Sequence, residues 1–511
     1  MRSVRDGLLA AGRRDHVLVE RLAADGTTAE THTYGRIADW SARIRSDLAS
    51  RGVRPGTRIG VVAGNGPQWV AADLALLLGG FVEVPVPLAF SGEQAASLLP
   101  EAGLCLADEA GARKLAEWGL AGRVTVLPVD DYAEAAGEPA AQEPPALPDE
   151  RIVKIIHTSG TTGTPKGVMI RAGALDALLA SLGSVSPAGV YDRYLSLVPF
   201  SLLVEQVTAV YLPILSGGRM VLLPDSAALL GTAGSRADDV ITWLRAARPT
   251  AAVLPPAAVS ALDKAVRGGG ASADTVLGEG VRPFLMAGGA PVDVAAQLRL
   301  DAAGLRVHEG YGLSENSSVV SWNTPGHWRP GTVGRPLPHC RVRLSEDGEL
   351  LVKSTSLFAG YTVEDPTSRP VDADGWLHTG DRAEIDEDGY IRILGRLKNV
   401  IITSHGRNVS PEWVEGSLRS CSAVLDAVVF GDGMEHLAAL LVVPEGTDPE
   451  TAREQARRLA GTRLAETDRP DTYVVVPDSR SLRDTYFTVT GRPRRQLIFD
   501  DLVRTATARA H

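Results

Sequence analysis

The sequence has little of what secreted, membrane-spanning or nucleic-acid-binding proteins need. Its three cysteines, Cys105, Cys340 and Cys421, are too widely separated for a disulfide framework or a cysteine-based metal site. No run of about 20 apolar residues is present, so we expect no membrane span. The chain starts with only a short apolar run, and no signal peptide is predicted. The net charge of −10 argues against nucleic acid or an anionic membrane as the main partner. We therefore expect a cytoplasmic protein.

The remaining composition is that of a large globular protein with several cores. A length of 511 residues corresponds to about three to four domain-sized units. Strand patterns alternate with helical patterns, as at 58–63 and 69–78, which predicts an α/β protein with layered sheets. Short strands separated by turns at 342–394 predict a small β-barrel lobe. We expect a large N-terminal domain, 1–395, and a small mobile α+β domain, 396–511.

One loop concentrates groups that suit a polyphosphate. The apolar stretch 152–156 predicts a buried strand, and the loop after it reads His-Thr-Ser-Gly-Thr-Thr-Gly-Thr-Pro-Lys-Gly over 157–167. Hydroxyl side chains and Lys166 lie among glycines, whose backbone can approach a ligand closely. The spacing is not that of a Walker A loop, which needs Gly, four residues and then Gly-Lys-Ser/Thr. The loop residues predicted to bind phosphate are Thr158, Ser159, Gly160, Thr161, Thr162 and Gly163.

Two further strand ends carry small or charged residues. They read Ala-Gly-Gly-Ala at 287–290 and Glu-Gly-Tyr-Gly-Leu-Ser-Glu at 309–315. Ligands of parallel α/β sheets bind beyond the carboxyl ends of the strands. We therefore expect these two segments and the loop at 157–167 to border one crevice.

Five segments resemble, in order, the motifs of the acyl-adenylate-forming superfamily of acyl-CoA synthetases, peptide-synthetase adenylation domains and beetle luciferases. They are the loop 157–167, Tyr-Gly-Leu-Ser-Glu at 311–315, Trp-Leu-His-Thr-Gly-Asp at 376–381, Gly-Arg-Leu-Lys-Asn at 395–399 and Gly-Arg-Asn-Val-Ser-Pro-Glu at 406–412. Residues 308–400 are most similar to the bacterial long-chain acyl-CoA synthetases. The resemblance implies an AMP-forming ligase. An acid attacks the α-phosphate of ATP, pyrophosphate leaves, and the acyl group passes to CoA, a carrier-protein thiol or an amine.

The resemblance also implies which residues handle the phosphates. Glu315, together with Thr161, would hold Mg²⁺, a hard cation that prefers oxygen ligands. Lys166 would neutralise charge on the phosphates, and Ser314 would contact the α-phosphate. These residues carry the chemistry of the first step.

A second set is implied to hold the nucleoside. Tyr311 would lie on the adenine, and Asp381 would accept hydrogen bonds from both ribose hydroxyls. The other residues implied to contact the nucleotide are Gly288, Gly289, Ala290, Glu309, Gly310, Ile393 and Arg396.

Two residues of the second domain are implied to act during catalysis. Lys398 lies at the hinge about which the family's small domain rotates between the two steps. The family's last motif supplies a catalytic lysine within Thr-x-x-Gly-Lys-x-x-Arg, but residues 488–495 read Thr-Val-Thr-Gly-Arg-Pro-Arg-Arg. Arg492 therefore takes the place of that lysine. A guanidinium can neutralise developing charge, although it is broader than an ammonium. The alternative, a solvated arginine with no catalytic part, stays open.

The acid-binding turn departs from the family as well. Many aryl-acid and long-chain members have Pro-x-x-His there, and Leu202 stands in place of that histidine. Phe200 falls where amino-acid adenylation domains have an aspartate, which argues against an α-amino acid substrate. We expect the acid to be bound by Phe200, Leu202, Leu203 and Asn316.

Two alternatives to an acid ligase stay open. A diazotase-type member would activate nitrite with ATP and diazotise an aryl amine, and loss of the usual His and Lys is compatible with such an atypical acid. A degenerate member would bind nucleotide without catalysis, although Lys166, Glu315 and Asp381 are intact.

The expected cofactors are ATP and Mg²⁺. The expected partners are a small-molecule acid, or nitrite plus an aryl amine, with CoA or a carrier protein as the candidate acceptor.

Overall fold

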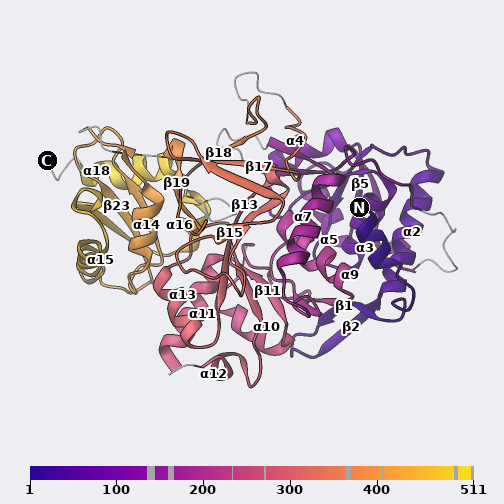
Figure 1. Ribbon diagram of the computed structural model, residues 1–511, viewed down its shortest axis with the longest axis horizontal. Helices are drawn as coiled ribbons and strands as arrows, with labels where there is room; N and C mark the ends of the chain where they lie inside the picture. The colour runs from indigo at the N-terminus through magenta and orange to yellow at the C-terminus, as the bar shows by residue number, and fades with distance from the viewer. Residues whose placement is uncertain are drawn as a thin grey trace.

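Two large sheets form the N-terminal part of the molecule, and a smaller α+β unit lies at its C-terminal end (Figure 1). The structure is a computed structural model that describes residues 1–134, 144–158, 166–232, 234–269, 272–363, 370–399, 401–404, 408–487 and 493–507. The indigo and purple elements lie at one end of the long axis and the yellow C-terminal elements at the other.

The nine-stranded sheet has the order β15-β14-β13-β12-β11-β9-β10-β1-β2. Its strands are β1 Val17–Leu22, β2 Thr28–Thr33, β9 Arg193–Leu195, β10 Arg219–Leu222, β11 Ala251–Leu254, β12 Phe284–Ala287, β13 Val307–Leu313, β14 Ser318–Trp322 and β15 Arg335–Pro336. The strands from β13 to β1 pair in parallel, which requires crossover connections. Helices α10 Asp239–Ala247, α11 Pro256–Gly269, α12 Ala273–Leu277 and α13 Val294–Ala302 lie in those connections.

The six-stranded sheet has the order β6-β5-β3-β4-β7-β8. Its strands are β3 Arg58–Val62, β4 Val82–Pro85, β5 Leu104–Ala107, β6 Thr125–Pro128, β7 Ile152–Thr158 and β8 Lys166–Arg171. The predicted strand at 152–156 is confirmed and extends to Thr158. Only β7 and β8 pair antiparallel, as a hairpin at the edge of the sheet.

Helices fill the space around these sheets. They are α1 Arg2–Leu8, α2 Tyr34–Ser50, α3 Pro67–Gly79, α4 Gly92–Ala102, α5 Glu109–Glu117, α6 Asp130–Glu134 and α7 Ala172–Val185. The predicted helix at 69–78 is confirmed as α3, which begins at Pro67 and ends before Gly80, whose φ is +71°. Every residue of α3 except Gln68 is buried, as expected for an apolar helix enclosed by the core.

The helical segment over residues 203–216 is not uniform. It consists of α8 Leu203–Glu205, the π-helical turn η1 Gln206–Tyr211 and α9 Leu212–Ser216. Pro213 lacks the N–H that would donate to the carbonyl of Ala209, so one hydrogen bond of the helix is missing at this point. The wider π turn lies directly before it, and such turns are frequent at functional sites.

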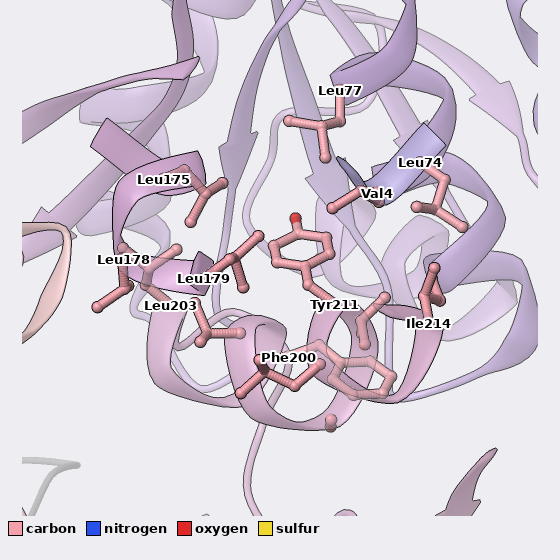
Figure 2. Close-up of a cluster of buried hydrophobic side chains, with 14 of the residues drawn as sticks. Val4, Leu74, Leu77, Leu175, Leu178, Leu179, Phe200, Leu203, Tyr211 and Ile214 are labelled. Atoms are coloured by element: carbon pink, nitrogen blue, oxygen red, sulfur yellow. The ribbon is translucent and has the colours of Figure 1, made fainter. Parts of the chain in front are cut away.

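The core contains a buried polar group. Figure 2 shows Tyr211 among apolar side chains that include Leu77 and Leu179. The Tyr211 hydroxyl donates to Asp73 Oδ1 at 2.7 Å, and the Lys154 ammonium donates to both Asp73 and Glu83. Burial raises the pKa of Glu83 well above its ordinary value. One lysine side chain and two carboxyl groups therefore share this interior site.

The lobe predicted at 342–394 is a four-stranded antiparallel sheet. Its strands, in hydrogen-bonded order, are β16 Cys340–Leu344, β17 Glu349–Ser354, β18 Leu377–Ile385 and β19 Ile391–Arg396. Gly348 and Gly389 have φ of +77° and +83° in the two tight turns, a conformation that glycine adopts at little cost. The register places Asp381 opposite Arg396.

The C-terminal segment is α+β, as predicted. A three-stranded sheet of β22 Asp426–Phe430, β23 Ala438–Val443 and β24 Thr472–Pro477 packs with α14 Pro411–Arg419 and α15 Pro449–Arg463. The other elements are η3 Leu397–Asn399, β20 Ile401–Ile402, β21 Asn408–Val409, η4 Glu466–Asp468, α16 Arg480–Tyr486, α17 Arg495–Ile498, η5 Phe499–Val503 and α18 Arg504–Thr507. The predicted boundary after residue 395 falls at the end of β19 and stays a prediction. None of the helices within the described ranges is long and apolar enough to cross a membrane.

Candidate active site

The β7–β8 hairpin fixes both ends of the predicted phosphate loop. Thr158 is the last residue of β7 and pairs with Lys166, the first residue of β8. The loop therefore starts and ends at the same place on the edge of the sheet. Five of the residues predicted to bind phosphate lie outside the described part of the chain: Ser159, Gly160, Thr161, Thr162 and Gly163. Their contacts with phosphate stay predictions.

Tyr361 connects Lys166 to Glu315. The Lys166 Nζ atom lies 5.5 Å from the centroid of the Tyr361 ring. The Tyr361 hydroxyl donates to Glu315 Oε1 at 2.8 Å. Burial, and then the Glu315 carboxylate, raises the pKa of Tyr361 far above its ordinary value, so the phenol keeps its proton. The structure thus brings together the predicted phosphate cation and the predicted metal ligand.

The segment that carries Tyr361 is held against β8. Three backbone hydrogen bonds of 2.8–3.0 Å join residues 359–362 to residues 167–169. The backbone N–H of Phe358 donates to the carbonyl of Glu315 at 2.8 Å. The chain after β17 therefore contacts both the phosphate-loop hairpin and the motif that contains Glu315.

Glu315 lies in a short 3-10 turn, η2 Ser314–Asn316, followed by strained backbone. Ser317 and Ser318 have φ of +54° and +118°, values that are uncommon for residues other than glycine. The Ser317 hydroxyl donates to the carbonyl of Ser356 at 2.7 Å. Strain of this kind persists where the surroundings hold it, and it clusters at functional sites.

Asn316 is fully buried, and its side chain is hydrogen-bonded within the protein. Its Nδ2 donates to the carbonyl of Val319 at 3.1 Å, and its Oδ1 accepts from the hydroxyls of Ser354 and Ser356. These bonds anchor the motif turn to β17 and the segment after it. A direct contact of Asn316 with the acid stays a prediction.

The three residues predicted near the ribose and adenine are neighbours. Asp381 is 4% exposed, and its Oδ1 lies 2.8 Å from Arg396 Nε. The Tyr311 hydroxyl donates to Asp381 Oδ2 at 2.5 Å, and burial followed by the Asp381 charge raises the pKa of Tyr311. Arg396 also donates to the carbonyl of Thr379 at 3.1 Å. Ile393 lies on β19, opposite Ala383 of β18.

Replacing Asp381 by Ala is expected to raise the KM for ATP about tenfold or more. A hydrogen bond to a charged group is worth about 1.5–3 kcal/mol, and the variant also leaves Arg396 and Tyr311 without this shared acceptor. Steady-state kinetics at varied ATP measures the effect. Asp388→Ala, which removes an exposed carboxylate from the same β18–β19 hairpin, is the control and should leave the KM unchanged. Equal values for both variants would remove Asp381 from the nucleotide site.

The loop after β12 approaches β13 closely. A Cβ on Gly288 would lie 3.1 Å from the carbonyl oxygen of Gly310, and Gly289 has a φ of +87°. Gly289 and Ala290 are exposed, so their backbone is accessible to a ligand. The loop and the end of β13 therefore form adjoining walls, as predicted for 287–290 and 309–315.

Glu309 anchors the far end of this loop. It is 5% exposed, and its carboxyl group accepts from the N–H of Val292 at 3.2 Å and from Gln297 Nε2 at 2.5 Å. Burial raises the pKa of Glu309 to about 8, so the group is mainly neutral at pH 7. In this structure the carboxyl group is hydrogen-bonded inside the protein. Its contact with the nucleotide stays a prediction.

Glu309 is expected to make the folded state less stable as the pH rises. Its pKa is raised on folding from 4.5 to about 8, so its stabilising contribution is complete below the unfolded value and declines between these two pH values. The Glu309→Gln variant should lack this part of the pH dependence. Urea unfolding midpoints between pH 5 and 8, as a rough working range, measure it. Glu384→Gln removes an exposed carboxylate and should keep the parent's slope; identical slopes for all three proteins would contradict the shift.

The predicted acid-binding residues differ in accessibility. Phe200 is 1% exposed, its ring centroid lies 4.9 Å from that of Trp69, and its N–H donates to Asn65 Oδ1 at 2.8 Å. Leu203 is 5% exposed, whereas Leu202 is 40% exposed. Phe200 thus fixes the turn in the core, and Leu202 is the accessible member of the three.

Comparison with known proteins decides the family. The AMP-binding enzyme family matches residues 10–362, and the AMP-binding enzyme C-terminal domain matches residues 398–463. The chain belongs to the AMP-binding enzyme family. Long-chain-fatty-acid–CoA ligase FadD15 of Mycobacterium bovis is 29% identical, over 85% of this chain and 80% of its own. Long chain acyl-CoA synthetase 7, peroxisomal, of Arabidopsis thaliana is also 29% identical, over 85% of this chain and 71% of its own.

Solved structures share the fold. The anthranilate CoA ligase AuaEII in complex with anthranoyl-AMP matches with a TM-score of 0.83 and 20% identity, over 99% of this chain and 98% of its own. ATP-bound MatB from Rhodopseudomonas palustris matches with a TM-score of 0.80 and 22% identity, over 98% of this chain and 99% of its own. The predicted α/β fold class is confirmed.

Membership in the AMP-binding enzyme family confirms the main functional prediction. The chain is an AMP-forming ligase that adenylates an acid with ATP. Neither the nitrite-dependent nor the non-catalytic alternative gains support from these comparisons.

The second domain's predicted catalytic residues are located only in part. Lys398 lies in η3, directly after β19. Arg492 lies outside the described residues, between Phe487 and Pro493, which form an antiparallel bridge. Arg495 anchors the segment after it by pairing with Glu415. The roles of Lys398 and Arg492 stay predictions.

The residues around Glu315 fit a magnesium ion held jointly with substrate. Within the described ranges, no group of three or more His, Cys, Asp or Glu side chains gathers to make an all-protein metal site. Mg²⁺ is commonly bound by one or two carboxylates together with substrate phosphates. A half-buried carboxylate beside Lys166 and the phosphate-loop hairpin matches that donor set.

Tyr361 is the contact residue that the sequence motifs did not reveal. Its local signal is modest: an aromatic residue after Gly360, which has a φ of +127°. The contact with Glu315 depends on how residues 359–362 pair with β8, and no short motif encodes that pairing.

Proposed function

We propose that this AMP-forming ligase is an acyl-CoA synthetase. A carboxylate oxygen of the acid attacks the α-phosphorus of ATP, the bond to the β-phosphate oxygen breaks, and pyrophosphate leaves. The CoA thiol then attacks the acyl carbon, loses its proton, and displaces AMP. The convergence of Lys166 and Glu315 on Tyr361, beside the phosphate-loop hairpin, is the observation that supports the ATP-dependent step of this proposal.

In the first step the protein's own groups neutralise the charge of the phosphates and position the reacting groups. Such transfers depend more on positioning than on covalent help. Lys166 lies at the loop exit, where its ammonium can meet the phosphates, and Glu315 and Thr161 would hold Mg²⁺. When bound, Mg²⁺ offsets the negative charge of the phosphates. Ser314 lies beside Glu315 and would contact the α-phosphate.

The nucleoside would be held by the cluster of Asp381, Arg396 and Tyr311. The carboxylate of Asp381 accepts from Arg396 and Tyr311, and we expect it to accept from the ribose hydroxyls when the nucleotide binds. The backbone of Gly288, Gly289 and Ala290 would lie along the adenine. Lys398 would serve as the hinge that presents a second face of residues 396–511 for the thiol step.

We further propose an apolar carboxylic acid as substrate and a cytoplasmic location. Leu202 is the accessible apolar side chain of the turn at 200–203, and these four residues include no charged partner for an amino group. Two relatives are named as long-chain fatty-acid and long-chain acyl-CoA enzymes, and one similar structure is an anthranilate ligase. CoA is the acceptor that these names share.

The test is a panel of fatty, aryl and amino acids, with nitrite plus an aryl amine as a separate arm. AMP and pyrophosphate are measured with and without CoA, and acyl-CoA is identified by mass. Acid-dependent AMP release that accelerates with CoA and yields acyl-CoA is the expected result. AMP release that depends on nitrite without CoA, or no release with any acid, would overturn the proposal.

A further inference from the structure

Tyr361 contacts two groups of opposite charge with two different parts of its side chain. The phenolic hydroxyl donates to Glu315 Oε1 at 2.8 Å, and the ring lies 5.5 Å from Lys166 Nζ. Lys166 begins β8 of the six-stranded sheet, whereas Glu315 lies in η2, between β13 and β14 of the nine-stranded sheet, and one aromatic side chain reaches both.

The backbone under Tyr361 is held at several points. Residue 361 forms an antiparallel bridge with Val168, and the ring of Phe358 packs edge-on against the Tyr361 ring at 4.9 Å. A Cβ on Gly167 would lie 2.7 Å from Thr362 Oγ1, so this strand pairing is a close one. A side chain fixed in this way can define the position of flexible partners.

We propose that Tyr361 is a positioning residue for both Glu315 and Lys166. Its hydroxyl orients the Glu315 carboxylate for the metal, and its ring holds the Lys166 ammonium at the exit of the phosphate loop. This inference rests on the proposed function, because it assigns a purpose to both contacts in binding metal and ATP.

The two contacts also keep the carboxylate and the ammonium from neutralising each other. A lysine and a glutamate this near the same ring could form a direct ion pair, which would withdraw both from ATP. The phenol occupies one carboxylate oxygen, and the ring face offers the ammonium a weaker partner that phosphate can displace. Tyr361 thereby leaves both charged groups available to ligands.

Two substitutions separate the contacts. Tyr361→Phe removes the hydroxyl and keeps the ring, whereas Tyr361→Leu removes both. The matched control is Tyr132→Phe, because the Tyr132 hydroxyl also donates to a carboxylate, Asp47 Oδ2 at 2.5 Å, between α6 and α2. All four proteins are compared as full chains, with thermal unfolding recorded for each.

The direct readout is binding rather than turnover. Electron paramagnetic resonance measures the affinity for Mn²⁺ in the presence of α,β-methylene-ATP, which resists cleavage at the bond that the reaction breaks. Tyr361→Phe should weaken Mn²⁺ binding about tenfold, the effect of losing a hydrogen bond to a charged group. Tyr361→Leu should in addition weaken α,β-methylene-ATP binding about threefold, from loss of the ring contact. Tyr132→Phe should match the parent in both.

The outcomes separate this inference from the proposed function. The positioning role would be overturned if Tyr361→Phe bound Mn²⁺ as tightly as the parent. It would also be overturned if Tyr132→Phe lost as much Mn²⁺ affinity as Tyr361→Phe. In both cases the parent still binds Mn²⁺ with nucleotide, so the proposed function would stand. Equal nucleotide affinity in Tyr361→Leu and Tyr361→Phe would overturn the ring contact with Lys166. A parent that binds no Mn²⁺ with α,β-methylene-ATP would contradict the proposed metal-dependent ligase itself.

Discussion

Replacing Glu315 by Gln is expected to slow acid adenylation about 10²- to 10³-fold and leave the fold intact. An amide has nearly the same shape as a carboxylate but carries no charge, so it is a weaker ligand for Mg²⁺. Electrostatic groups of this kind commonly contribute about 10²–10³ in rate. The Tyr361 hydroxyl can still donate to the amide oxygen, which favours retention of the local structure. The measurement is single-turnover AMP formation at saturating ATP over a range of Mg²⁺ concentrations.

The control for Glu315→Gln is Glu384→Gln. Glu384 lies on β18 with its side chain exposed, and its Oε2 lies 3.5 Å from Arg392 Nη1. This variant loses one unit of negative charge from the molecule, as Glu315→Gln does, and should keep the parent's rate and Mg²⁺ dependence. A Glu315→Gln enzyme with the same rate and the same Mg²⁺ dependence would contradict the metal role.

Replacing Arg492 by Ala is expected to slow AMP formation about 10²-fold or more, with ATP binding nearly unchanged. If the second domain brings a cation to the acid oxygen and the α-phosphate, Arg492 holds the place of the family's lysine. Its removal takes away a charge that acts in the transition state rather than on ATP alone. Arg492→Lys should restore part or all of the activity.

The neighbouring Arg494 provides the control for Arg492→Ala. Arg494 is exposed, and its Nη1 donates to the carbonyl of Thr485 at 3.3 Å. Arg494→Ala should therefore leave AMP formation unchanged. An Arg492→Ala enzyme as fast as the parent would show that this arginine is not the catalytic cation, whereas loss in Arg494→Ala alone would transfer that role to Arg494.

Local strand pairing creates the contact between Asp381 and Arg396, two residues that the family resemblance implied for a nucleotide site. Asp381 and Arg396 lie on successive strands joined by a tight turn at Gly389, and the hairpin register places them opposite each other. Strand patterns and turn glycines are signals that a sequence displays directly. The same holds for Lys166, which the β7–β8 hairpin places at the loop exit.

Contacts between distant segments could not be predicted in this way. Tyr361 meets Glu315 because residues 359–362 pair along β8, and the buried carboxyl group of Glu309 accepts a hydrogen bond from Gln297 of α13. Neither pairing leaves a periodic or spacing signal in the chain. The π turn before Pro213 could not be predicted either. A helical pattern of apolar residues does not show which turn of the helix will be wider.

The most direct measurement of the central claim is acid-dependent exchange of labelled pyrophosphate into ATP, without CoA. An enzyme that forms an acyl-adenylate reversibly incorporates label into ATP when, and only when, its acid is present. The expected result is exchange that requires the acid and Mg²⁺, persists in Glu384→Gln, and is lost in Glu315→Gln. Absence of acid-dependent exchange with every acid that supports AMP release, or equal exchange in Glu315→Gln and the parent, would contradict adenylation at this site.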